Sequence, residues 1–207
     1  MGSNEKFNKK SPRGGISLCR LDQFTAKNGY KELIYTPGND VILTSRREYF
    51  ESILVDGKEV LIEEDSEKFN VVVPTLINPV VKIRFKKGIT RFSYCFLTSY
   101  LISIPGDLFS DNPEVTNFGY IFYTCSSLTS IPEDLFRYNP EATDFSACFY
   151  SCDSLTSIPE NLFKYNTKIT DFDNCFQDCK NLKTMPIDSD GTPIYNRSTL
   201  ENLDIVL

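Results

Sequence analysis

The sequence predicts an α/β solenoid, in which short strands and helical turns wind into parallel coils stacked along one axis. Two observations lead to this prediction. Nearly the same 27-residue stretch occurs twice in succession, first from Cys125 to Ser151 and then from Cys152 to Asp178. Upstream, residues 32–86 alternate in the manner of β-strands, which predicts an antiparallel β cap on the first coil.

Leucine, isoleucine, proline and phenylalanine all recur at this step of 27 residues in the second half of the chain. The leucines stand at Leu101, Leu128, Leu155 and Leu182. A fixed period of this length is typical of repeat proteins, in which no unit buries its own apolar face and neighbouring units must stack. We therefore expect these four leucines to lie in successive parallel strands.

Within one unit, the stretch Leu-Thr-Ser-Ile predicts a short strand. Pro132 then begins a helical turn, where its missing N–H does no harm. A second short helix is expected to follow, with Phe145 and Phe149 four residues apart on its inner face. Strand, turn, helix and return together make one coil of a leucine-rich repeat.

These units resemble the BspA-like leucine-rich repeats of gut and oral Bacteroidetes surface proteins. The resemblance is carried by CSSLTSIPEDLF and CDSLTSIPENLF and covers about residues 92–187. The preceding segment, from ILVDGKEVLIEE to PVVKIRFKKG, looks like the β-rich lead-in that such proteins often carry. The resemblance implies a right-handed parallel solenoid with a binding or adhesion role, and it implies no enzyme.

Four parts are expected along the chain. They are an extended basic arm at 1–20, a β-rich N-terminal cap domain at 21–91, the leucine-rich repeat solenoid at 92–187 and a C-terminal cap at 188–207. In the β-rich part, Asp56-Gly57 suits a tight turn between two strands, and a second hairpin is expected around residues 37–40. The stretches KFNVVV and PVVKIRF supply two more strands.

Composition narrows the classes of function. The chain has 207 residues and a net charge of −6, and an acidic chain is a poor nucleic-acid binder. No apolar run approaches the roughly 20 residues that cross a bilayer. The chain has no histidine, which excludes a Ser-His or Cys-His catalytic pair. We therefore expect a chain without catalytic activity, cofactor or metal.

Five of the seven cysteines fall into two repeat columns. Cys148-x3-Cys152 and Cys175-x3-Cys179 have the look of a four-thiolate zinc site, but Cys125 extends one column and duplication alone produces the pattern. Parallel side chains do not converge on an ion, so we expect a buried structural ladder, with a disulfide or a metal site as the alternatives. A third column is expected to satisfy backbone groups with its amides: Asn112, Asn139 and Asn166.

Positions that vary between repeats are candidates for contact with a partner. Tyr138 and Tyr165 are expected to form a short exposed stack with basic neighbours, a combination typical of protein-contact surfaces. The alternative is that these rings only cover the edge of the coils. The full set of partner-binding candidates is Arg137, Tyr138, Lys164, Tyr165, Tyr123 and Tyr150, with Lys9, Lys10 and Arg13 in the arm.

Two functions fit these observations. The first is a protein-binding or adhesion module, extracellular or at a cell surface if a signal peptide was removed. The second is a structural subunit of a larger assembly, such as a bacteriophage virion. The polar start MGSNEKFNKKSPRGG lacks the apolar stretch of an intact signal peptide. Its four basic residues and one acidic residue leave a body near −9, so we expect the arm to tether the chain to an identical or related neighbour.

Overall fold

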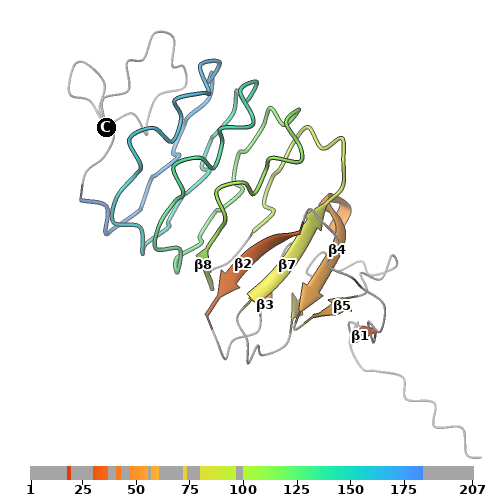
Figure 1. Ribbon diagram of the computed structural model, residues 1–207. Helices are drawn as coiled ribbons and strands as arrows, with labels where there is room; N and C mark the ends of the chain where they lie inside the picture. The colour runs from red at the N-terminus through yellow and green to blue at the C-terminus, as the bar shows by residue number, and fades with distance from the viewer. Residues whose placement is uncertain are drawn as a thin grey trace, which may run out of the picture.

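The computed structural model contains an antiparallel β-sheet followed by a stack of turn-rich layers (Figure 1). It describes residues 18–19, 30–36, 41–42, 47–55, 57–60, 72–73, 80–96 and 100–183. Most of the predicted arm and the whole predicted C-terminal cap at 188–207 lie outside these residues. The division of the chain into four parts stays a prediction.

The main sheet is open and antiparallel throughout. Five strands lie in the order β5-β4-β7-β2-β8, and the two-residue strand β1 pairs with β5 at the edge. A separate pair joins β3 to β6. The elements are β1 (Leu18–Cys19), β2 (Lys31–Tyr35), β3 (Val41–Ile42), the 3-10 helix η1 (Arg47–Tyr49), β4 (Phe50–Val55), β5 (Lys58–Val60), β6 (Val72–Val73), β7 (Val80–Phe85) and β8 (Leu101–Ser103).

The two predicted hairpins have different outcomes. The hairpin at Asp56-Gly57 is confirmed, because Val55 pairs with Lys58 and Gly57 adopts a φ of 72°, a left-handed conformation that glycine tolerates. The hairpin around residues 37–40 is wrong. Strand β2 pairs with β7 and β8, whereas β3 pairs with β6.

The predicted fold class, an α/β solenoid of right-handed parallel coils, is wrong. Regular pairing is confined to antiparallel strands, and the described residues contain no α-helix. Leu101 lies in β8, which runs antiparallel to β2, whereas Leu128 and Leu155 lie in no strand. Proline follows the Ser-Ile pair of the repeats, as at Pro132, and it has no N–H to donate to a strand ladder.

The predicted helices are replaced by chains of four-residue turns, in which the N–H of residue i+3 donates to the carbonyl of residue i. Cys148 N donates to Phe145 O, and Tyr150 N donates to Ala147 O. The N–H groups between them point to the next layer, where Phe149 N donates to Cys175 O at 2.8 Å. Because alternate N–H groups leave the local turn, the continuous i to i−4 pattern of an α-helix cannot form.

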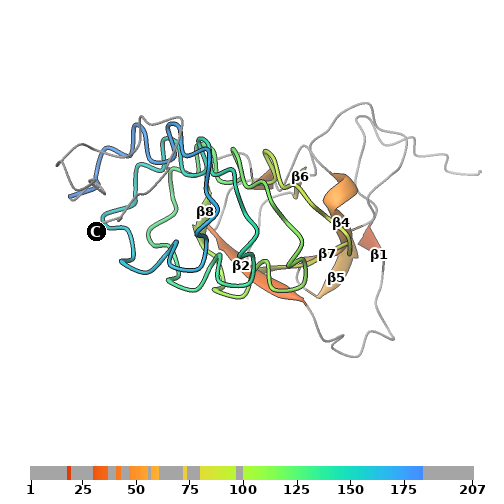
Figure 2. The ribbon, with the colours of Figure 1, turned by 90° about the horizontal axis from the view of Figure 1, so that it is seen from above.

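Residues 90–183 form what we call the layered segment, in which the chain passes the same edge four times. Isolated parallel bridges join Arg91 to Asn117, Asn117 to Asp144 and Asp144 to Asp171. Each pass is one layer, and the layers follow one another away from the sheet (Figure 2). The repeat therefore produces stacking without producing regular strands.

Columns of phenylalanine fill the interior of the layered segment. One column stacks Phe96 on Phe122, Phe122 on Phe149 and Phe149 on Phe176, with ring centres 5.2–5.5 Å apart. A second column stacks Phe109, Phe136 and Phe163 at 5.9 and 5.7 Å. All of these rings are buried.

The asparagine column joins the layers through their backbones, as predicted. Asn139 Nδ2 donates to Asn112 O at 2.7 Å, and Asn166 Nδ2 donates to Asn139 O at 2.8 Å. At the start of the column, Asn112 Nδ2 donates to Lys86 O at 2.7 Å, just after β7. The column therefore continues from the layers to the sheet.

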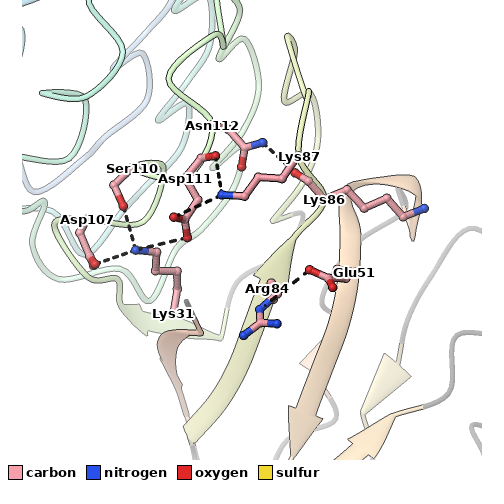
Figure 3. A network of polar contacts seen from close by, with 9 residues as sticks. All are labelled: Lys31, Glu51, Arg84, Lys86, Lys87, Asp107, Ser110, Asp111 and Asn112. Atoms are coloured by element: carbon pink, nitrogen blue, oxygen red, sulfur yellow. Dashed lines mark hydrogen bonds and ion pairs between the residues drawn. The ribbon is translucent and has the colours of Figure 1, made fainter. Parts of the chain in front are cut away.

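A buried lysine fixes the sheet to the first layer (Figure 3). Lys31 in β2 donates to Asp107 Oδ2 at 2.6 Å and to Ser110 Oγ at 2.9 Å, and its ammonium lies 3.8 Å from Asp111 Oδ2. Lys87, after β7, lies 3.4 Å from Asp111 Oδ1. Lys31 in β2 and Lys87 just after β7 therefore bind the same turn, at residues 107–111. These contacts orient the stack of layers on the sheet.

Seven residues other than glycine have positive φ, and they recur at two positions in successive layers. They are Tyr94, Tyr120, Thr124, Ala147, Ser151, Asn174 and Asp178, with φ between 48° and 62°. This left-handed conformation costs a residue with a side chain about 1–2 kcal/mol. The left-handed conformation turns alternate N–H groups toward the next layer, and the hydrogen bonds made there offset its cost.

We expect Ser151→Gly to raise the free energy of unfolding by about 0.5–1 kcal/mol, because glycine adopts positive φ without strain. Ser154 is the matched control, since it is also half-buried and has no positive φ. Ser154→Gly should lower stability by about 0.5–1 kcal/mol. Chemical denaturation of both variants measures the difference, and a loss of stability in both would contradict the role given to the left-handed positions.

Candidate binding surfaces

The described residues offer two aromatic surfaces, one exposed and one half-buried, and no cluster of metal ligands. No group of three or more His, Cys, Asp or Glu side chains there could hold a metal ion. Within the same part of the chain, no helix has the length and apolar character needed to cross a membrane. The two aromatic surfaces are therefore the candidate binding sites among the described residues.

The first surface, which we call the Arg137–Tyr165 patch, comprises Arg137, Tyr138, Lys164 and Tyr165. The two tyrosines are the most exposed large hydrophobic side chains described, at 43% and 42%. The guanidinium of Arg137 lies 5.4 Å from the centre of the Tyr165 ring, and Lys164 Nζ lies 5.9 Å from it. The patch therefore combines cation–π contacts with exposed rings.

Buried neighbours orient this patch outward. Phe136 and Asn139 flank the first pair of patch residues, and both are buried. A turn closed by Asn139 N donating to Phe136 O at 3.1 Å leaves Arg137 and Tyr138 on the outside. Arg137 also lies 3.5 Å from Asp134 Oδ1.

The expected stack of Tyr138 on Tyr165 does not form. Among the ring contacts of the described residues, none joins these two tyrosines, and it is Arg137 that lies over Tyr165. A guanidinium can cover an aromatic face in place of a second ring. The two layers still contact each other here, through a basic residue and an aromatic one.

The second surface, the tyrosine block, lies at a different turn of the layers and comprises Tyr94, Tyr120, Tyr123 and Tyr150. Tyr94 stacks on Tyr120 at 4.7 Å, and Tyr123 stacks on Tyr150 at 4.9 Å. Tyr120 and Tyr123, within one layer, are 5.7 Å apart. All four are half-buried.

Only half of the tyrosine block could be predicted from the sequence. Tyr123 and Tyr150 stand 27 residues apart, and the repeat pairs them. Tyr94 and Tyr120 are 26 residues apart, because the first unit is one residue shorter at this point. Phe96 and Phe122 are also 26 residues apart. This shared spacing could have indicated from the sequence that Tyr94 and Tyr120 lie together.

One acidic side chain of the last layer contacts the tyrosine block, and two others form a column across the last two layers. Tyr150 donates from its hydroxyl to Asp178 Oδ2 at 2.6 Å, and this hydrogen bond is the main reason why the pKa of Tyr150 is raised. Asp144 and Asp171 occupy one column, joined by a parallel bridge. Burial raises the pKa of Asp171, and the negative charges of Asp144 and Asp173 raise it further.

The six cysteines of the layered segment are buried free thiols. The predicted structural ladder is confirmed for one column, in which each thiol donates to a phenylalanine carbonyl of the preceding layer: Cys125 to Phe96 O at 3.0 Å, Cys152 to Phe122 O at 3.3 Å and Cys179 to Phe149 O at 3.0 Å. Burial raises the pKa of Cys179 to about 12 and raises that of Cys152 well above its usual value. These thiols are therefore weak nucleophiles.

The three basic candidates in the arm, Lys9, Lys10 and Arg13, lie outside the described residues. Comparison of the chain with known protein families, curated proteins and solved structures found no match. The resemblance to BspA-like repeats therefore stays a prediction. The two surfaces and the charge of the chain are the features that bear on its function.

We expect these six thiols to be unreactive in the native protein at pH 8, because all of them are buried away from the reagent and burial raises the pKa of Cys95, Cys125, Cys148, Cys152 and Cys179. A Cys19→Ser background removes the cysteine whose side chain is not described. On that background, a thiol-specific disulfide reagent should label no cysteine of the native protein within minutes and all six after unfolding. Chelator should leave the melting temperature unchanged. Rapid native labelling, or a chelator-dependent loss of stability restored by zinc, would contradict the ladder.

We expect Asp171→Asn to raise the melting temperature at pH 7. The pKa of Asp171 in the folded state lies above its usual value, so the folded protein binds the proton more tightly than the unfolded chain does, and stability falls as pH rises through that range. The asparagine can still accept the hydrogen bond that Asp173 N donates to Oδ1 at 3.1 Å.

The same variant should show no advantage below the pKa of the unfolded carboxyl, where Asp171 is protonated in both states. Thermal unfolding of both proteins from pH 3 to pH 7 tests this. Asp107→Asn is the control of opposite sign, because it weakens the ion pair of 2.6 Å with buried Lys31 and should lower the melting temperature. Equal melting temperatures for wild type and Asp171→Asn at pH 7 would refute the expectation.

Proposed function

We propose that this chain is a non-catalytic protein-binding or adhesion module that acts at a cell surface or after secretion. The observation that carries the proposal is the Arg137–Tyr165 patch. Arginine and tyrosine are enriched at the centres of protein interfaces, and here Arg137 is already held over an exposed Tyr165 ring. A partner that covers the patch would desolvate both groups and strengthen the contact between them.

The chemistry of the chain supports a role without catalysis. There is no histidine to act as a general base. Six thiols are buried, and burial raises the pKa of groups such as Cys125 and Cys152, which keeps them protonated. A binding role needs neither a nucleophile nor a base, and it makes use of exposed rings that would otherwise be costly to leave in water.

A second candidate function is a structural subunit of a larger assembly, such as a bacteriophage virion. Charge distribution favours it. Residues 1–15 carry a net positive charge, whereas the remainder of the chain is strongly acidic. Basic segments on acidic bodies attract identical copies, since potentials of opposite sign steer association. This candidate predicts self-association, which the adhesion module does not require.

Peptide selection tests the role of the Arg137–Tyr165 patch without knowledge of the natural partner. A random peptide library displayed on phage is selected on the wild-type protein, and the enriched peptides are titrated against Arg137→Ala/Tyr165→Ala. We expect binding to weaken by about tenfold or more, the loss that accompanies truncation of interface centre residues.

The control is Glu141→Ala/Lys168→Ala, which removes an exposed ion pair of 2.5 Å between the same two layers. Exposed pairs of this kind contribute about 0–1 kcal/mol, so this variant should fold and bind the enriched peptides as wild type does. If no peptide is enriched, or if the peptides bind the patch variant and the wild type equally, the proposed function fails.

A further inference from the structure

Hydrogen bonds between the backbones of successive layers run in one direction over the turns that carry positive φ. Phe145 N donates to Asp171 O and Phe149 N donates to Cys175 O, each at 2.8 Å. Two further alternate N–H groups of that layer donate forward in the same way, and the preceding layer makes the same four bonds. Over these turns, each layer therefore presents only N–H groups to the layer that follows it.

The last layer has the same row of donors. Its four N–H groups belong to the residues that stand 27 positions after the donors of the preceding layer: Phe172, Asn174, Phe176 and Asp178. Asn174 and Asp178 have a φ of 59°, so the row keeps the conformation of the inner layers. No described residue accepts a hydrogen bond from these four groups. Because backbone N–H groups of buried residues are almost always paired, this edge requires a row of acceptors.

The aromatic rings of the last layer are buried although no described layer follows them. Phe176 stacks on Phe149 at 5.3 Å on its inner side. Its other ring contacts are to Phe163 and Phe172, within its own repeat unit. Phe172 and Phe176 are nevertheless only 1% and 0% exposed. A ring at the end of a stack has one face in water unless a segment lies over it, so the end of this stack requires a covering segment.

The direction of the donors limits what can cover this edge. The same edge of a second copy would place N–H groups against N–H groups, and it offers no acceptors. A head-to-tail copy would have to bring its first layer, but the sheet occupies that end of the stack (Figure 1). Phe85 of β7 lies 4.6 Å from Phe92, and Ser93 N donates to the Tyr49 hydroxyl at 3.3 Å. A cover from the same chain meets neither obstacle.

We propose that residues 184–207 of the same chain dock on this edge. Their main-chain carbonyl oxygens accept from the four N–H groups, and their apolar side chains cover the rings of Phe172 and Phe176. The segment leaves from the last layer itself, because Lys183 N donates to Thr156 O in the preceding layer. Its 24 residues approach the 27 of one layer, and they include the apolar residues Ile194, Leu203 and Ile205.

This docking has a consequence for how the chain meets a partner. The sequence predicts a cap at 188–207, and the edge specifies what such a cap has to supply, namely a row of acceptors and an apolar surface. With the end of the stack closed, the sides of the layers, including the Arg137–Tyr165 patch, stay free for a partner. Copies of the chain would then assemble through their sides, and stacking end to end would be blocked.

Amide hydrogen exchange of the full-length protein, followed residue by residue by NMR, tests the docking. The four last-layer amides are compared with their counterparts one layer earlier, Phe145, Ala147, Phe149 and Ser151. We expect both rows to exchange at least about 100-fold more slowly than unprotected amides, because hydrogen bonds in stable structure protect them. The unprotected reference is given by exposed residues whose N–H groups donate to no described residue, Tyr138 and Tyr165.

Two full-length variants identify the covering segment. The apolar variant, Ile194→Asp/Leu203→Asp/Ile205→Asp, places charges where apolar side chains stand. The control, Ser189→Asp/Ser198→Asp/Asn202→Asp, adds the same charge at polar positions of the same segment. We expect the apolar variant to speed exchange of the last-layer amides at least about tenfold and to leave the preceding row unchanged, which shows that the other layers stay folded. The control should exchange as wild type does.

Each measurement is made at two protein concentrations about 25-fold apart, because a second copy would protect the edge by mass action. The proposal is overturned if the last-layer amides of wild type exchange as fast as those of Tyr138 and Tyr165, or if their protection rises with concentration. It is also overturned if the apolar variant exchanges as the control does. Peptide binding to the Arg137–Tyr165 patch is measured separately, so these outcomes leave the proposed function standing.

Discussion

Burial of phenylalanine rings between successive layers is the interaction on which the rest of the structure depends. A fully buried phenylalanine contributes about 1.5–3 kcal/mol, and a stacked ring pair adds about 0.5–1.5 kcal/mol. Exposed ion pairs such as Lys168–Glu141 contribute about 0–1 kcal/mol each. The aromatic columns therefore decide the layer spacing of 5.2–5.9 Å, and backbone groups adapt to it by left-handed turns, amide ladders and thiol hydrogen bonds.

The sheet completes the first aromatic layer. Phe85 at the end of β7 lies 4.6 Å from Phe92 and 6.2 Å from Phe109, so the sheet core and the layer core form one hydrophobic cluster. Lys31 is buried at the contact between the sheet and the first layer, where it is neutralised by Asp107 and its neighbours. Breaking such a pair on one side is far more costly than its net contribution, so the pair fixes the turn at residues 107–111, one layer before the turn that carries Arg137 and Tyr138.

Repetition predicted contacts better than it predicted conformation. The 27-residue step correctly indicated which side chains meet, as in the asparagine column and the cysteine column, because identical layers must place identical residues together. It could not indicate the backbone, since Phe145 and Phe149 suit a helix as well as a chain of turns with Ala147 at positive φ. The solenoid of strands and helices was therefore wrong. Tyr138 and Tyr165 were correctly expected to be exposed, but the position of the Arg137 guanidinium over the Tyr165 ring depends on side-chain geometry that spacing does not encode.

The repeat also imposes an electrostatic constraint on its charged columns. A charged residue copied unchanged into the next layer faces its own charge at the layer spacing. Glu141–Lys168, Asp153–Lys180 and Asn117–Asp144 avoid this with an opposite charge or an amide. Other columns repeat the same sign, and they are Asp107–Asp134, Glu114–Glu141, Glu133–Glu160, Arg137–Lys164 and Asp144–Asp171. The first four of these pairs are exposed, where charges interact weakly, whereas Asp171 is half-buried and its pKa is raised by burial and by the charge of Asp144. The stack therefore tolerates repeated charges at its surface, because the buried aromatic columns, and not the charges, hold successive layers together.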